Sequence, residues 1–149
     1  MIMFLRENRV SLGIVAEKAL EKLGAQNNQK KRLLVVTRDT KIATGVALAF
    51  HRNCFFEAAI VPSAFGAGLE FAEHRPDFTV IDLAIGQDEA LLVLNKIYDA
   101  KNENIIVLLP FAESAAVVKR YPQVYECLVK PFRISRLLGK IDSFFFHKI

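Results

Sequence analysis

Two ionisable residues stand where apolar runs end, and together they could bind a phosphoryl group or another anion. Asp82 closes the run FTVID (78–82). Lys130 follows the run VYECLV (124–129) and precedes Pro131. A carboxylate at a strand end can act as a nucleophile, a metal ligand or a cation partner, and beside an ammonium it forms a usable anion site. Such an Asp can also be no more than a helix cap or turn former.

Five short apolar runs rich in Val, Ile and Phe predict the strands that position these residues. Such continuous apolar runs are typical of strands that are covered on both faces. The runs are RLLVV (32–36), FFEAAIV (55–61), FTVID (78–82), NIIVLL (104–109) and VYECLV (124–129).

Segments with helical spacing of apolar residues follow each strand. Ser63 is a plausible N-cap of the second helix, and Asp88 opens the third. Residues 112–120 are predicted to form a short fourth helix. In the other four helices, the predicted core-facing residues are, in chain order, Ile42, Val46, Ala49 and Phe50; Phe65, Leu69 and Ala72; Leu91, Leu94, Ile97 and Tyr98; and Ile134, Leu137, Leu138, Ile141, Phe144 and Phe145. Strands alternating with single helices predict an α/β fold with a five-stranded parallel sheet and helices on both faces.

Ligands of such folds bind outside the carboxyl ends of the strands, where the strand order reverses. This rule brings the two ionisable residues to one edge of the sheet. The residues to inspect there are Thr37, Arg38 and Asp39 after the first strand, Asp82 after the third, Leu109 and Pro110 after the fourth, and Lys130 after the fifth.

Residues 1–29 differ in character from the rest and are predicted to form an N-terminal helix and a linker, separate from a domain at 30–149. The helix has one apolar stripe, and GAQNNQ (24–29) reads as polar linker. The stripe consists of Leu12, Val15, Ala16, Ala19, Leu20 and Leu23. Such a helix either packs on its own domain or pairs between chains.

The composition fits one compact domain with a substantial core. The 149 residues are 52% hydrophobic and 24% charged, which argues against disorder. The net charge is +4, but the basic residues are scattered, and no aromatic residues are interleaved with the one dense cluster at Lys30, Lys31 and Arg32. This basic cluster is therefore interpreted as the solvated start of a strand rather than as a nucleic-acid-binding surface.

Cysteine usage and the N-terminus point to the cytoplasm. Cys54 and Cys127 form no CxxC pair, so neither a zinc site nor a disulfide framework is indicated. The apolar start at 1–5 is too short for a signal peptide or a bilayer span. We therefore predict a cytoplasmic protein without membrane contact.

The motifs RPDFTVIDLAIG (75–86) and YECLVKPF (125–132), in a chain of five βα units, resemble the receiver domain of bacterial two-component response regulators. The resemblance covers about residues 30–147. It implies a flavodoxin-like receiver fold in which Asp82 accepts a phosphoryl group from a histidine kinase. It also implies that Lys130 contacts the phosphoryl oxygens and that Pro131 follows a cis peptide bond.

Several working parts of the family are replaced. The resemblance implies two acids after the first strand that hold magnesium, but Thr37 and Arg38 occupy these positions, and Asp39 comes one place late. Only Asp82, Asp39 and the Ala84 carbonyl remain as weak magnesium ligands. The switch hydroxyl after the fourth strand is matched by Leu109, and the switch aromatic of the fifth strand is matched by Cys127.

Arg38 raises its own hypothesis, because a guanidinium can take the place of a metal ion beside a carboxylate. We expect Arg38 to pair with Asp82 and to hold positive charge there without magnesium. The alternative is that Arg38 points to solvent at the start of the first helix.

These residues predict a degenerate receiver, or pseudo-receiver: no enzyme, no cofactor, and signalling by protein contacts with impaired phosphorylation. One alternative is a working receiver that phosphorylates Asp82 with an atypical magnesium site. Another is a flavodoxin-like domain that binds a small molecule. The expected partners are a histidine kinase or an output protein, and a second copy bound through the face of the fourth helix, fifth strand and fifth helix, where Val117, Val118, Cys127 and Phe144–Phe146 lie.

Nucleic acid is expected only through a partner or a further domain. FLRENRVSLG (4–13) loosely resembles the tail of an excisionase-type helix-turn-helix.

Overall fold

A computed structural model describes residues 30–98 and 104–146 of the chain. The strands are β1 (Lys31–Val36), β2 (Phe56–Val61), β3 (Phe78–Asp82), β4 (Ile105–Leu109) and β5 (Val124–Val129). The helices are α3 (Thr40–Phe50), α4 (Ala64–His74), α5 (Gln87–Tyr98), α6 (Ala115–Val118) and α7 (Ile134–Phe146), with 3-10 turns η2 (Leu83–Ile85) and η3 (Ala112–Ser114). The predicted N-terminal helix and linker at 1–29 lie outside the described residues.

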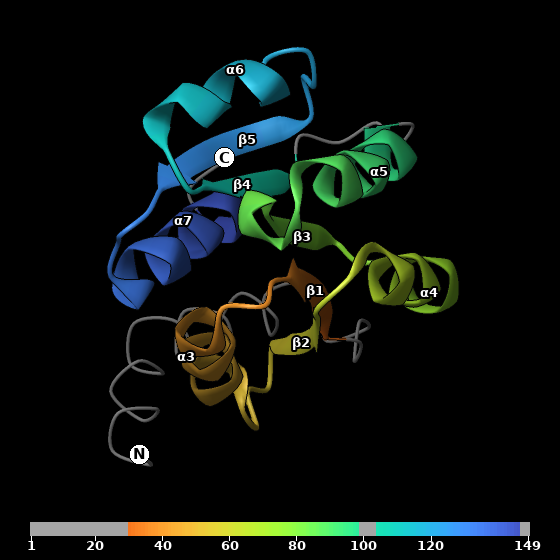
Figure 1. Cartoon of the computed structure of the whole chain (residues 1–149). Coiled ribbons are helices and arrows are strands. Elements are labelled where there is room, and N and C mark those ends of the chain that lie inside the picture. Colours follow the sequence, from red (N-terminus) through yellow and green to blue (C-terminus); the bar gives the residue numbers. More distant parts are fainter. Residues whose placement is uncertain (1–29, 99–103, 147–149) are drawn as a thin grey trace.

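The strands form one parallel sheet, as the alternating sequence pattern predicts, and their order is β2-β1-β3-β4-β5. Helices α3 and α7 cover one face, while α4 and α5 cover the other (Figure 1). This is the predicted flavodoxin-like arrangement. It places the ends of β1 and β3 side by side, with β5 two strands away from β3.

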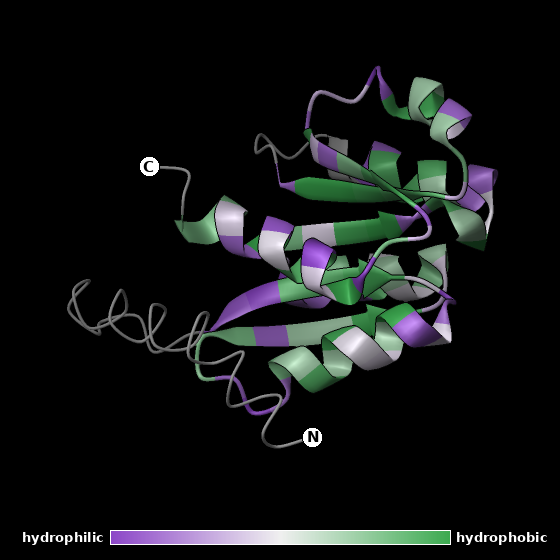
Figure 2. Cartoon of the chain, turned by 90° about the vertical axis from the view of Figure 1, so that its left-hand side faces the viewer, coloured by the Kyte–Doolittle hydropathy of each residue, from purple (hydrophilic) through white to green (hydrophobic). Residues whose placement is uncertain are grey.

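The sheet is apolar on both faces, and each face has its own core. Figure 2 shows strands that are mostly hydrophobic between helices of mixed character. On the α3–α7 side the core includes Val46, Phe56 and Leu137, and on the other side it includes Ile81, Leu94 and Val107. Among the described residues, no helix is both long and apolar enough to cross a bilayer.

Capping side chains set the start of two helices. Asp39 accepts hydrogen bonds from the amides of Lys41 and Ile42 at the start of α3, and Ser63 accepts one from Gly66 at the start of α4. These bonds satisfy amides that have no partner within a helix. The predicted N-cap at Ser63 is confirmed.

Helix α4 faces the core with a different side from the one predicted. Phe65 and Leu69 are exposed, while Ala67 is buried and Phe71 packs on the core. The cause is the close approach of α4 to the sheet, where a Cβ on Gly66 would lie 3.1 Å from Val61 Cβ. Small residues therefore take the inner face, and large ones remain outside.

The phenylalanine run at the end of α7 packs on the domain instead of adding an uncovered apolar surface. Ring centroids are 4.6 Å apart for Phe144 and Phe78, and 5.1 Å apart for Phe145 and Phe56. Phe146 lies 5.3 Å from Phe55. The prediction that this run leaves apolar area for a partner was therefore wrong, because the rings cover the α3–α7 core.

Candidate functional site

The carboxyl edge of the sheet brings together the residues that the sequence singled out. Asp82 is the last residue of β3, Thr37 follows β1, and Lys130 follows β5. The Lys130–Pro131 peptide bond is cis, as predicted. Asp82 and Thr37 are 1% and 3% exposed, so the centre of this cluster is closed to solvent.

Asp82 has hydrogen-bond donors on both carboxylate oxygens. Its Oδ2 accepts from the Thr37 hydroxyl at 2.7 Å and from Lys130 Nζ at 2.8 Å. Its Oδ1 accepts from the Ala84 amide at 3.0 Å. A buried carboxylate requires such partners, since an unpaired charge away from water is costly. The expected approach of Lys130 to Asp82 is therefore present in the folded chain.

Asp39 is the second carboxylate at Lys130. Its Oδ2 lies 3.4 Å from Lys130 Nζ, while its Oδ1 caps α3. Burial alone would raise the pKa of Asp39, but the amides of Ile42 and Lys41 and the charge of Lys130 outweigh it and lower that pKa below its ordinary value. One ammonium thus bridges two carboxylates, and the three side chains form an ion triad.

Arg38 does not pair with Asp82, which corrects the hypothesis made from the sequence. Its guanidinium donates to the Pro62 carbonyl at 2.9 Å and to the Ile85 carbonyl at 3.3 Å. It also forms an ion pair with Glu89 at 3.3 Å. The Arg38 side chain is about half exposed, and the side-chain donors to Asp82 are Lys130 and Thr37.

The contacts of Arg38 join three loops at the carboxyl edge. Glu89 Oε2, which pairs with Arg38, also accepts from the Ala64 amide at 3.1 Å. Arg38 therefore connects the end of β1 with the start of α4 and with the turn after β3. We call this set of contacts the Arg38 brace. Sequence reasoning missed it, since only Glu89 in the first turn of α5 hinted at an acidic partner.

The two proposed switch positions have no polar role in the described contacts. Leu109 is buried among the side chains under α5 and α6, and its carbonyl accepts from the Lys130 amide at 2.8 Å. Cys127 is partly buried beside the same core. Burial, followed by the charge of Glu126, raises the pKa of the Cys127 thiol. Leu109 has no side-chain hydrogen-bonding group, and Cys127 offers only a weakly bonding thiol and no aromatic ring.

The donor set at this edge does not fit a magnesium ion. Magnesium needs oxygen ligands around an open octahedral position. Here Lys130 Nζ lies between the Asp39 and Asp82 carboxylates, and the hydroxyl of Thr37 donates its proton to Asp82. Among residues 30–98 and 104–146, no group of three or more His, Cys, Asp or Glu side chains is arranged to hold a metal. Asp39 and Asp82, the two predicted weak ligands, bind an ammonium instead.

Comparison by sequence finds no relative for this chain: no family model matches it, and no curated protein does.

Comparison by structure finds many similar domains. The receiver domain of Francisella response regulator 1452 is 19% identical with a TM-score of 0.66, over 80% of this chain and all of that one. The signal receiver domain of an HD domain-containing protein from Pseudomonas fluorescens Pf-5 is 17% identical with a TM-score of 0.66, over 80% and 97%. A response regulator signal receiver domain from Bermanella marisrubri is 25% identical with a TM-score of 0.61, over 76% and 96%. The strand order, the strand-end Asp82 and Lys130, and these matches identify the fold as that of response-regulator receiver domains.

Proposed function

We propose that this chain is a cytoplasmic receiver-type signalling domain that works through contacts with other proteins and does not depend on magnesium-assisted phosphorylation of Asp82. The main support is the ion triad. A phosphoryl donor must reach a carboxylate oxygen, and in this chain Asp82 Oδ2 is bound by Thr37 and Lys130 while the side chain is 1% exposed. The natural partners are a histidine kinase or an output protein of a two-component system.

The absence of acids at positions 37 and 38 supports the same proposal. Phosphoryl transfer to a carboxylate needs positive charge that neutralises the transferring group, which magnesium and lysine commonly supply together. Lys130 is present, but Thr37 and Arg38 offer magnesium no carboxylate. The ammonium of Lys130, which contacts Asp82, is already paired with both Asp82 and Asp39.

The test is intact-mass spectrometry after incubation with acetyl phosphate, with and without Mg²⁺. We expect no phosphoryl adduct on the natural chain under either condition. Asp82→Asn is the control for modification at any other site. An adduct that requires both Asp82 and Mg²⁺ would contradict the proposal.

The Thr37→Asp variant serves as a positive control for magnesium binding. A carboxylate at this position would lie against Asp82, and the two like charges would favour a divalent ion between them. We expect Thr37→Asp to be stabilised by millimolar Mg²⁺ in thermal unfolding, while Mg²⁺ leaves the natural chain unchanged. If the natural chain is stabilised as much as Thr37→Asp, it already has a working metal site.

A working phospho-acceptor with an atypical metal site is the second candidate function. It is favoured by the placement of Asp82, Lys130 and cis-Pro131 at one edge of the sheet. The acetyl phosphate experiment separates the two, because this candidate requires the Asp82 adduct.

We also propose that the chain self-associates through the face formed by α6, β5 and α7. The exposed apolar residues near this face are Phe111 and Val129. Val129 of β5 pairs with Leu109 on the neighbouring strand β4, and Phe111 lies two residues after Leu109. We expect light scattering to detect a dimer that Phe111→Ser weakens. A monomer at high concentration, unaffected by this change, would remove the dimer from the proposal.

A further inference from the structure

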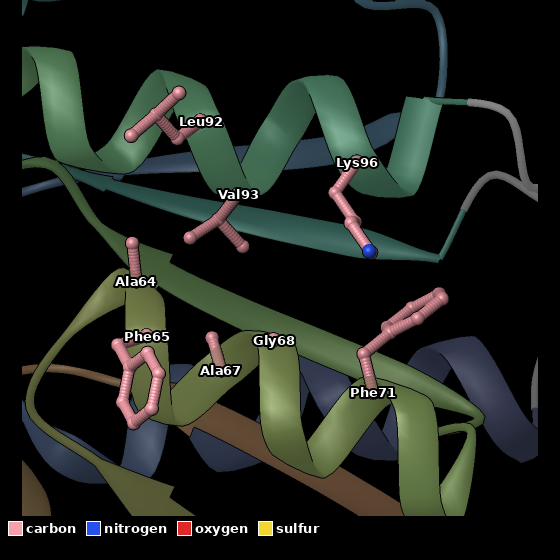
Figure 3. A pocket seen from close by; sticks show the side chains of 8 residues that line it. All are labelled: Ala64, Phe65, Ala67, Gly68, Phe71, Leu92, Val93 and Lys96. Atoms are coloured by element: carbon pink, nitrogen blue, oxygen red, sulfur yellow. The ribbon is translucent and has the colours of Figure 1, made fainter.

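An apolar opening lies between α4 and α5, on the face opposite to α3 and α7. It has a volume of about 340 Å³ and runs along both helices (Figure 3). We call it the α4–α5 groove. Its lining is apolar except for one lysine, and consists of Ala64, Phe65, Ala67, Gly68, Phe71, Leu92, Val93 and Lys96.

Large exposed apolar side chains form the rims of the groove, and small residues form its floor. Phe65 on α4 is 76% exposed and Leu92 on α5 is 64% exposed. Ala64, Ala67 and Gly68 line the groove on α4 (Figure 3). A Cβ on Gly68 would meet no heavy atom within 4 Å, so the space above it is open. Small residues on a floor allow another helix to approach closely, and exposed apolar rims mark an interaction site.

The N-terminal segment has a sequence that matches this groove. Leu12, Val15, Ala16, Ala19, Leu20 and Leu23 form one continuous stripe at helical spacing. An isolated helix of this length is marginal in water unless its apolar face is covered. As a helix, residues 12–23 would be about 18 Å long, and the 11 residues of α4 span about 16 Å.

The described chain begins beside one end of the groove. Arg32 Nη1 donates to the His74 carbonyl at 2.8 Å, and the Arg32 amide donates to Asp77 at 2.8 Å. The start of β1 is thereby tied to the end of α4, and Phe71 and Lys96 line the groove in the last turns of α4 and α5. Residues 24–30 can extend over about 23 Å, which is more than the about 16 Å that α4 spans.

We infer that residues 12–23 form a helix that docks its apolar stripe in the α4–α5 groove of the same chain. A short linker gives such a segment an effective concentration in the millimolar range. This favours the chain's own segment over a second copy or another protein. The inference is independent of the function proposed above, because the groove shares no residue with the ion triad.

The experiment measures amide hydrogen exchange of residues 12–23 in the full chain by mass spectrometry. We expect exchange about tenfold or more slower than that of an unfolded chain of the same sequence. The rate should not depend on protein concentration, because the contact is within one molecule.

Two glycines provide a matched pair of variants. Gly68→Gln places a side chain in the groove from a position where a Cβ meets no heavy atom within 4 Å, and Gly139→Gln does the same at an open position on α7, away from the groove. We expect Gly68→Gln to return residues 12–23 to fast exchange and Gly139→Gln to leave them protected. Protection that survives Gly68→Gln would overturn the inference.

A second pair lies in the segment itself and cannot unfold the domain core. Leu20→Gln interrupts the stripe, while Glu21→Gln changes only the opposite face. Loss of protection with Leu20→Gln alone supports docking of this face. Fast exchange in the natural chain, or protection that disappears on dilution, contradicts docking within one chain, and the latter result assigns the groove to a second copy.

Discussion

Thr37 Oγ1 donates a 2.7 Å hydrogen bond to Asp82 Oδ2, and both side chains are almost fully buried. The same Thr37 oxygen accepts from the Asp39 amide at 3.0 Å. The hydroxyl therefore couples the end of β3 to the cap of α3. The end of β1 thus offers Asp82 a neutral donor, and Asp82 accepts hydrogen bonds from the residues that follow β1, β3 and β5.

Replacing Lys130 by Met should destabilise the fold, because it leaves the Asp82 carboxylate buried without a cation. Removing one partner of a buried ion pair typically costs about 3 to 5 kcal/mol. Lys130 is partly exposed, so we expect the lower end, about 3 kcal/mol, in urea unfolding. Lys130→Met with Asp82→Asn should recover much of the loss. Equal stability of Lys130→Met and the natural chain would show that the triad contributes nothing.

Replacing Arg38 by Ala should loosen the three loops that the Arg38 brace joins. The guanidinium is about half exposed, so we expect a loss of only about 1 kcal/mol. The Ala64 amide donates a hydrogen bond to Glu89, and its hydrogen exchange should become faster. Arg38→Lys is the control: it keeps the charge near Glu89 but cannot reach both carbonyls, so its effect should be intermediate. Unchanged exchange at Ala64 would argue against a brace.

The lowered pKa of Asp39 gives the fold a dependence on acidic pH. A carboxylate with a folded-state pKa below its unfolded value of 3.8 stabilises the protein above that pH. This contribution is lost as the pH falls through the lowered pKa. We expect Asp39→Asn, which can still cap α3, to flatten the fall in stability below about pH 4. An unchanged acid slope in this variant would show that other carboxylates dominate.

Gly45 of α3 lies against Ile134, the first residue of α7. A Cβ at this position would lie 2.6 Å from Ile134 Cγ1, so Gly45→Ala must displace Ile134. We expect it to cost about 1 to 3 kcal/mol, as overpacking does. Gly139→Ala, in an exposed and open part of α7, should instead stabilise by about 0.5 to 1 kcal/mol. Shortening the neighbour with Ile134→Ala should relieve Gly45→Ala; if it does not, the contact is not the cause.

The strands, and the placement of Asp82 and Lys130 at one edge of the sheet, could be predicted because both follow from strong, local patterns. Apolar runs of five or six residues predict buried strands, and parallel connection puts their carboxyl ends at one edge. The alternation does not by itself give the strand order; the approach of Lys130 to Asp82 followed from the resemblance to receivers. The cis bond before Pro131 followed from the resemblance and is present.

The inner face of α4 and the direction of Arg38 could not be predicted, for different reasons. In α4 both the Phe65–Leu69 side and the Ala67–Phe71 side have apolar residues at helical spacing, so periodicity alone does not choose between them. The distance from helix to sheet decides, and that depends on Val61 and Gly66 together. Arg38 has carbonyl partners, and a sequence pattern carries no information about where backbone carbonyls point.

The Arg38 brace also restricts how this sequence could change over time. An acid at position 38 would remove the donors to Pro62, Ile85 and Glu89 before any metal site existed, since Thr37 would still hold Asp82. An acid at position 37 would leave the Arg38 brace in place, but it would remove the hydroxyl bond to Asp82 and set two carboxylates against each other unless a cation lies between them. Each single change to an acid therefore first removes hydrogen bonds that hold the carboxyl edge of the sheet together.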